Sequence, residues 1–132
     1  GAEAARVLAK IPDPRLGLLW DAGNAYHLGE EPFPSGYRAV RAVIPTERLF
    51  HVHLKDARPD PEAKKPVYCR FGDGEIDFGG QFRALVEDGF AGVMSLETHW
   101  RHPTGNKELA SRECLEAIRA LIERLGLADR IV

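Results

Sequence analysis

Apolar residues dominate three short segments of the chain, and each segment stops at a carboxylate or a histidine. The segments run from Leu16 to Asp21, from Leu49 to His53 and from Gly92 to Glu97. Nearly continuous apolar runs of this length are typical of parallel strands that are buried on both faces, and loop and helix signals follow each of them. The pattern therefore predicts an α/β fold in which parallel strands alternate with helices.

The segments around the first strand predict helices and a loop. Apolar residues at helical spacing predict a helix from Ala2 to Ile11, ahead of the first strand. Glycines and prolines in residues 22–34 exclude regular structure there, so we expect a loop. Ser35 is then expected to cap a short helix that ends at Pro45.

The second half of the chain repeats this order. Residues 57–76 contain several prolines and glycines and are expected to form the longest loop, of a length that usually carries function. Asp77 is expected to cap a helix that runs to Glu87, before the third strand. Thr104 is expected to cap the last helix, whose apolar stripe ends before Gly126.

Chain length limits the architecture that these elements can form. A complete eight-stranded α/β barrel needs about 250 residues, whereas this sequence has 132. We therefore expect residues 1–132 to form a single partial domain, the C-terminal part of a TIM (β/α)8 barrel whose N-terminal half is absent. A helix at the start of the chain, where a strand would be expected, agrees with this interpretation.

Charge and cysteine content indicate the kind of partner and compartment. The 18 basic and 20 acidic residues are scattered and give a net charge of -2, which offers no electrostatic footprint for nucleic acid or an anionic membrane. A small-molecule partner is expected instead. Cys69 and Cys114 show no metal or disulfide spacing, and no segment resembles a membrane span or a signal peptide, so we expect a cytoplasmic protein.

The strand ends carry the candidate chemistry. Because side chains alternate along a strand, Asp21, His53 and Glu97 should point to one side of the sheet, together with His51 and Ser95. The opposite side is wholly apolar. Neighbouring strands lie about 4.8 Å apart, so three such tips can converge on one ion. Carboxylate and imidazole ligands suit Mn²⁺, Mg²⁺, Co²⁺, Zn²⁺ or Fe²⁺, and the ligand types do not choose among them.

Four motifs, in this order, resemble the C-terminal half of the xylose isomerase-like TIM barrels: WDAGNAYH, HVHLKD, GDGEIDF and SLE. This superfamily, which includes the AP endonuclease family 2 type, contains sugar phosphate isomerases and epimerases, inosose dehydratases and endonuclease IV. The resemblance covers nearly the whole chain. It implies that Asp21, His53 and Glu97 are metal ligands from strands six, seven and eight, and that a fourth ligand, a glutamate ending strand five, would precede Gly1.

Further residues near these strand ends are candidates for binding substrate. Asn24 stands where the family often has a histidine, and with His27 it follows Asp21 on the active face. Lys55, Asp56 and Arg58 follow the second strand and could bind a hydroxyl, carboxylate or phosphate, or could lie in a solvated loop.

Other polar and aromatic residues have two open interpretations. His51 is expected to support a ligand or to pack inside the sheet. His99, Trp100 and His102 lie beyond Glu97, where they either line a pocket or form a surface loop. GDGEIDF lacks the spacing of a phosphate-binding loop and is interpreted as a turn that shapes the site.

The favoured hypothesis for the complete protein is a metal-dependent isomerase or epimerase of a sugar or polyol. The ion would polarise a carbonyl and stabilise an enediolate while Glu97 acts as the base. An endonuclease IV-like phosphodiesterase is an alternative, but it needs three zinc ions, and Asn24 replaces a further histidine ligand. A third hypothesis is a non-catalytic half-barrel that only assembles. We expect an oligomer or pairing with the missing half.

Overall fold

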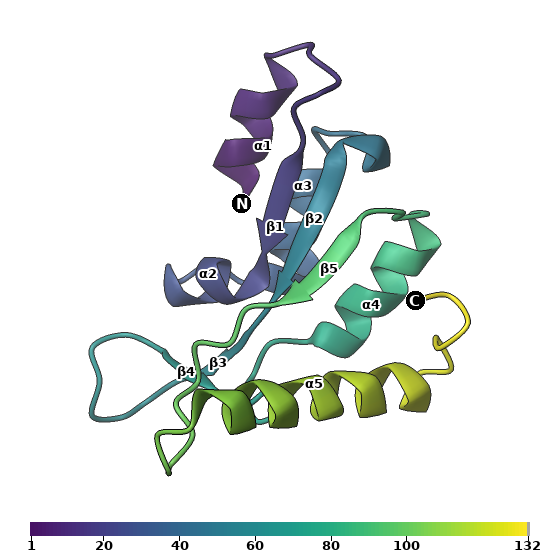
Figure 1. Cartoon of the computed structure of the whole chain (residues 1–132). Coiled ribbons are helices and arrows are strands. Elements are labelled where there is room, and N and C mark those ends of the chain that lie inside the picture. Colours follow the sequence, from purple (N-terminus) through teal and green to yellow (C-terminus); the bar gives the residue numbers. More distant parts are fainter. Residues whose placement is uncertain (132) are drawn as a thin grey trace.

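The structure is a computed structural model, and it describes residues 1–131. Its main sheet contains three parallel strands, β1 (Leu18–Asp21), β2 (Leu49–Leu54) and β5 (Val93–Leu96), with β2 in the centre (Figure 1). In the register of this sheet, Asp21 lies opposite His53, and His53 lies opposite Ser95. The three strands that the sequence predicts are therefore confirmed, and their ends lie side by side.

Helices follow each strand of the sheet. The described residues form α1 (Ala2–Ala9), α2 (Ala22–His27), α3 (Tyr37–Arg41), α4 (Phe78–Glu87) and α5 (Lys107–Arg124), with short helical turns at Pro32–Gly36 and Thr46–Arg48. In Figure 1, α3 lies behind β1 and β2, whereas the near face of the sheet carries no helix of the described chain. The helices thus cover one face of the sheet and leave the other open.

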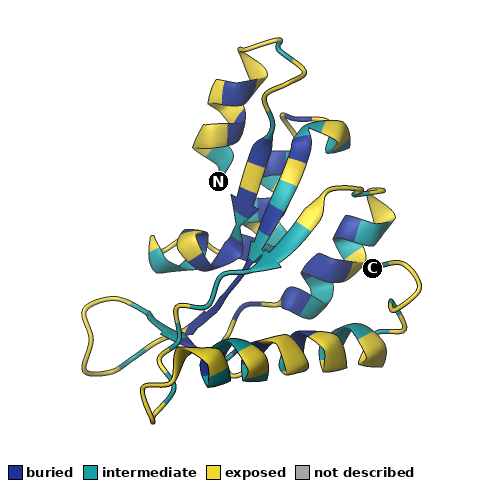
Figure 2. Ribbon diagram, in the orientation of Figure 1, coloured by how far each residue is buried: buried dark blue, intermediate teal, exposed yellow. Residues whose placement is uncertain are grey.

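Burial follows the predicted alternation of side chains. Trp20 and Val52 point into the layer between sheet and helices and are buried, and the indole Nε1 of Trp20 donates to Oε1 of Gln81 at 3.1 Å. On the other side, Leu19 is 45% exposed and Val93 is 60% exposed, which Figure 2 shows as exposed bands on the strands. The apolar layer therefore stabilises the fold from one face only.

Two segments that we expected to be loops contain regular structure. Residues 22–27 form α2 because the Asp21 carboxylate caps this helix, accepting the backbone N–H of Asn24 at 2.8 Å. The predicted loop at 57–76 contains a hairpin of β3 (Asp56–Arg58) and β4 (Val67–Cys69). The first prediction was wrong because the local cap at Asp21 starts a helix despite the glycine in residues 22–27. The second was wrong because the hairpin depends on pairing between residues that are distant in sequence.

The predicted helix caps are partly confirmed. The Asp77 carboxylate caps α4 by accepting the Gly80 N–H at 2.8 Å. Ser35, however, contacts the Glu31 side chain and caps no helix, and α3 begins without a side-chain cap. The cap of α5 is Asn106 rather than Thr104, because the Asn106 side chain accepts the first free N–H groups of that helix.

Two further features of the described residues concern the cysteines and the helices. Cys69 and Cys114 are free thiols and are buried, and burial raises the pKa of Cys69 to about 12. Across residues 1–131, no helix combines the length and the apolar character that a membrane crossing requires.

Candidate metal centre

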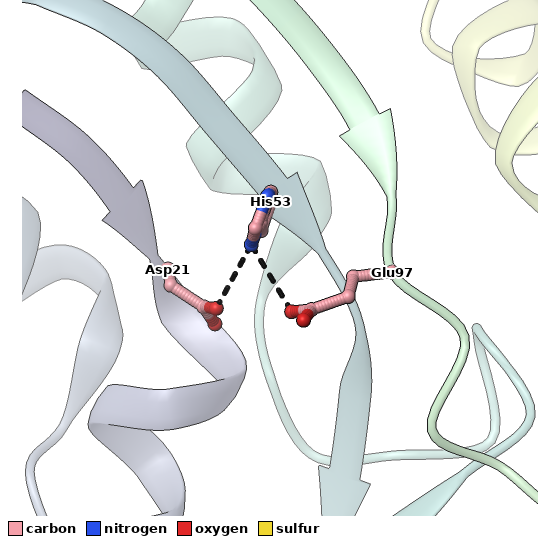
Figure 3. A group of neighbouring side chains, drawn as sticks. All are labelled: Asp21, His53 and Glu97. Carbon is pink, nitrogen blue, oxygen red and sulfur yellow. Dashed lines mark hydrogen bonds and ion pairs between the residues drawn. The ribbon is translucent and has the colours of Figure 1, made fainter.

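The ends of the three parallel strands bring three ligand-type side chains together. Asp21 ends β1, His53 lies in β2, and Glu97 follows β5, where its N–H donates to the carbonyl of Leu54 at 3.1 Å and continues the ladder. Figure 3 shows the two carboxylates facing the imidazole from either side. His53 Nδ1 lies 3.4 Å from Asp21 Oδ2 and 3.0 Å from Glu97 Oε2. The predicted convergence of the three side chains is confirmed.

The donor set of this cluster fits one divalent ion. One ligand atom from each of the three residues lies within 4.8 Å of the others. Zinc bonds of about 2.0–2.2 Å place any two ligand atoms no more than about 4.4 Å apart, and both distances from His53 Nδ1 are shorter than this. Two carboxylates and one imidazole therefore match the chemistry of such an ion, and small movements of the carboxylates would complete the fit.

Lys55 occupies the middle of the cluster. Its Nζ atom lies 2.9 Å from Asp21 Oδ2 and also pairs with the Glu97 carboxylate, and the residue is only 4% exposed. Burial by itself lowers the pKa of Lys55, but hydrogen bonds to Glu97 and Asp21 outweigh it and raise that pKa above its ordinary value. The same hydrogen bond from Lys55 lowers the pKa of Glu97. The predicted substrate-binding lysine is thus bound to the ligand carboxylates.

His51 contacts the imidazole of His53 within the sheet. Its Nε2 atom lies 2.7 Å from Ser95 Oγ, and its ring meets the His53 ring edge-on, with the centroids 5.1 Å apart. These contacts restrict the orientation of His53. The structure therefore favours the interpretation of His51 as a residue that supports a ligand.

Asn24 and His27 both contact Tyr68, a residue that we did not predict from the sequence. Tyr68, on β4, donates its hydroxyl hydrogen bond to Asn24 Oδ1 at 3.2 Å, and its ring stacks on His27 with the centroids 5.3 Å apart. The same ring lies 4.8 Å from that of His99 and 5.6 Å from Lys55 Nζ. No local sequence pattern predicts this role of Tyr68, because its position near Asn24 and His27 depends on the hairpin.

Asp56 and Arg58 differ in position and partners. The Asp56 carboxylate is buried and accepts the N–H groups of Ala57, Gly72 and Gly74, so it holds the glycine-rich turn and is not free to bind substrate. Burial raises the pKa of Asp56, although the N–H bonds oppose this effect. Arg58 is exposed on β3, and its contact with substrate stays a prediction. In GDGEIDF, residues 72–75 form a turn and bends, and Phe78 begins α4.

The segment beyond Glu97 lines a cleft. A cavity of about 600 Å³ is bordered by His99, Trp100 and His102 and by the start of α5. Ring contacts of His99 with Tyr68 connect this cleft to the cluster. The pocket-lining interpretation of these three residues is therefore favoured over that of a plain surface loop.

Comparisons with known proteins identify related sequences. A family profile described as xylose isomerase-like TIM barrel matches residues 1–121. The chain is 34% identical to the inosose dehydratase of Klebsiella pneumoniae over 102 residues, which is 66% of this chain and 32% of that protein. It is 32% identical to the inosose dehydratase of Serratia proteamaculans over 111 residues, 73% of this chain and 35% of that protein. The chain thus spans about a third of the length of these relatives.

Solved structures show the same fold. A crystal structure of the IolI protein with a bound zinc atom has a TM-score of 0.66 and 20% identity, covering 96% of this chain and 43% of that one. A xylose isomerase domain protein from Alicyclobacillus acidocaldarius has a TM-score of 0.66 and 26% identity, covering 96% of this chain and 44% of that one. The predicted fold class, part of a TIM barrel, is therefore confirmed. Because the family profile matches nearly the whole sequence, this chain belongs to the xylose isomerase-like TIM barrel family.

Proposed function

We propose that the complete protein binds a divalent metal ion at Asp21, His53 and Glu97 and moves a proton next to the carbonyl of a sugar or polyol. The observation that carries this proposal is the convergence of the three side chains at the carboxyl ends of adjacent parallel strands. This end of an α/β barrel is where active sites form. A bound ion would supply Lewis-acid polarisation of the carbonyl oxygen.

Glu97 is the residue that we propose as the base. Its side chain is 38% exposed, whereas that of Asp21 is 8% exposed, so Glu97 is the more accessible carboxylate of the cluster. A carboxylate with this exposure can reach a substrate and accept a proton from it. Asp21 is restrained by its bond to the Asn24 N–H and is better suited to holding the ion.

The residues around the cluster would orient the substrate. Asn24, His27, Lys55 and Arg58 are the proposed contacts, and Tyr68 fixes the first two by its hydroxyl bond and its stacked ring. Polar groups held in this way lower the entropic cost of positioning a substrate. Hydroxyl-rich substrates such as sugars and polyols fit such a set of donors and acceptors.

The fate of the proton separates two candidate reactions. Returning it to carbon gives isomerisation or epimerisation, the reaction that we favour for the complete protein. The similarity to inosose dehydratases favours a second candidate, in which removal of the proton leads to loss of a hydroxyl group as water. Both reactions begin with the same proton abstraction, so the cluster of Glu97 and the metal ligands serves either one.

Hydrogen exchange in D2O tests the shared step. The full protein is loaded with Mn²⁺, Co²⁺, Zn²⁺ or Mg²⁺ and incubated with ketoses and inososes, and NMR follows the carbon-bound hydrogen next to the carbonyl. We expect exchange with at least one metal, and mass spectrometry then shows whether water is lost.

A matched pair of variants assigns the step to the proposed base. Glu97→Gln should slow exchange by roughly 100-fold or more, since a general base contributes about that factor. Glu116→Gln, a change at an exposed position of α5, should leave it unaltered. Absence of exchange in the wild type with every metal, or full exchange in Glu97→Gln, would contradict the proposal.

A further inference from the structure

One cation of the chain stands inside the candidate metal centre. The Lys55 ammonium contacts Oδ2 of Asp21 and Oε2 of Glu97, so it lies between the two carboxylates. The imidazole of His53 contacts the same two oxygens. Without a cation between them, the carboxylates would face each other at short range, which is unfavourable in a partly buried site. Lys55 therefore stabilises the arrangement of the ligand set before any ion arrives.

The surroundings of Lys55 hold it in this position. A Cβ atom at Gly23 would lie 2.4 Å from Lys55 Cγ and 2.7 Å from its carbonyl oxygen, so only glycine leaves room for the lysine stem beside α2. The Tyr68 ring lies 5.6 Å from Nζ and provides an aromatic face for the ammonium. Lys55 is almost fully buried as a result. Contacts with α2, with the hairpin and with two strand ends together hold Lys55 in this position.

A metal ion and this ammonium would compete for the same atoms. The ion needs Oδ2 of Asp21 and Oε2 of Glu97, the two oxygens that face His53 Nδ1, and these are the oxygens that Lys55 contacts. A divalent cation and an ammonium a few ångströms apart also repel each other strongly in a site with little water. Binding of the ion to these oxygens is therefore favoured when the ammonium has moved away from them.

We propose that Lys55 is an internal competitor of the metal, which holds the Asp21 and Glu97 carboxylates in the metal-free protein and leaves them when a divalent ion binds. This inference rests on the proposed metal-dependent function. It makes the apparent metal affinity depend on breaking two ion pairs of Lys55, since only the fraction of protein with the lysine displaced can bind the ion. Metal loading also releases the ammonium, which then becomes available to an oxygen of the substrate.

Metal titration by calorimetry tests the competition, with Mn²⁺ and Zn²⁺ as probes and the purified, metal-stripped full protein. Lys55→Met keeps the stem and removes the charge, and it should lower the metal Kd by about tenfold or more, because no cation has to be displaced. Lys55→Arg restores a buried cation and should return the Kd to the wild-type value or weaker. Lys64→Met, a matched change at an exposed lysine of the hairpin loop, should have no effect.

Thermal unfolding checks the fold of the variants. Lys55→Met should unfold at a lower temperature than the wild type without metal, because its carboxylates lack a partner, and it should gain more from added metal. A purely structural lysine would give the first effect without tighter metal binding.

Chemical labelling tests the same inference in the unmodified protein. Acetic anhydride followed by peptide mass spectrometry should label Lys55 poorly without metal and readily with saturating metal, whereas Lys64 should react equally in both states. Equal metal Kd values for the wild type and Lys55→Met would overturn this inference, and so would labelling of Lys55 that is the same with and without metal. Neither result would contradict the proposed metal centre. A complete lack of metal binding in every variant would overturn the proposed function as well.

Discussion

His53 is the side chain on which the candidate metal centre depends most. Its Nδ1 atom contacts both carboxylates, and the edge-on contact with His51 restricts the orientation of its ring. The residue lies on the open face of the sheet and is only half-buried. Its removal should therefore affect ion binding far more than core packing.

We expect His53→Ala to weaken divalent-metal binding by more than roughly 100-fold, given that loss of even an indirect partner costs about 10–100-fold. The free energy of unfolding without metal should change by no more than about 1 kcal/mol, as for other substitutions outside the core. Calorimetric titration and urea unfolding measure the two quantities. His102→Ala is the control and should retain metal binding. Unchanged metal affinity in His53→Ala would make His53 a structural residue.

Among the secondary-structure elements, α5 shows how one side chain sets a helix start. The Asn106 side chain accepts the N–H groups of Glu108 at 2.9 Å and Leu109 at 3.1 Å. Thr104, which we expected in this role, bonds instead to His102 and to the N–H of Asn106. The cap thus lies two residues later than predicted.

Asn106→Ala should reduce the free energy of unfolding by about 1 kcal/mol, because two N–H groups of α5 lose their acceptor. Asn106→Asp keeps an acceptor at the same position and should remain close to the wild type. Urea unfolding followed by circular dichroism compares the three proteins. If Asn106→Ala were as stable as the wild type, the cap would not contribute to stability.

A second pair of elements, α3 and α4, is joined by a buried tyrosine. The Tyr37 hydroxyl donates to Asp88 Oδ2 at 2.8 Å, at the C-terminus of α4. Burial first, and then the Asp88 carboxylate, raise the pKa of Tyr37 above its ordinary value. Since the pKa is higher in the folded than in the unfolded protein, this group stabilises the fold fully below about pH 10 and loses that contribution as the pH rises further.

Tyr37→Phe should lower the free energy of unfolding by about 1 kcal/mol near neutral pH, as expected for one lost hydrogen bond. The difference from the wild type should shrink at about pH 11, because the unfolded wild-type tyrosine ionises there and phenylalanine does not. Urea unfolding at both pH values gives the comparison. A difference that grows with pH would contradict the assigned direction of the pKa.

At the scale of the whole molecule, the sheet is open on one face and at its edges. Within residues 1–131, β1 and β5 each pair only with β2. Leu19 and Val93 lie on the open face and are exposed. Unpaired strand edges and exposed apolar side chains favour association with another polypeptide. The related proteins, which are about twice as long, have further chain that can supply such cover.

The isolated 132-residue chain should therefore dimerise, aggregate or require the remainder of the protein. Sedimentation velocity on this chain, with and without a co-expressed segment that precedes it in the complete protein, measures the effect. We expect a defined, soluble species with the partner segment and self-association without it. A monodisperse monomer that unfolds cooperatively would identify a self-sufficient domain.

Sequence patterns alone predict the three strands, the side to which their residues point and the convergence of Asp21, His53 and Glu97. These features follow from local patterns: strand residues alternate with a period of two, and parallel strands end at a common edge. The cap of α4 at Asp77 was predictable for the same reason, since the cap bonds to an N–H only three residues away.

Elements and contacts that join distant segments could not be predicted from the sequence and are seen only in the folded structure. The hairpin is formed by antiparallel pairing of β3 with β4, and it brings Tyr68 onto Asn24, 44 residues away in sequence. Lys55 reaches Glu97 across 42 residues, so a residue that we predicted to contact substrate pairs with carboxylates of the candidate metal centre. Such contacts leave no periodic trace in the sequence, because their energy arises only when the chain has folded and removed these polar groups from water.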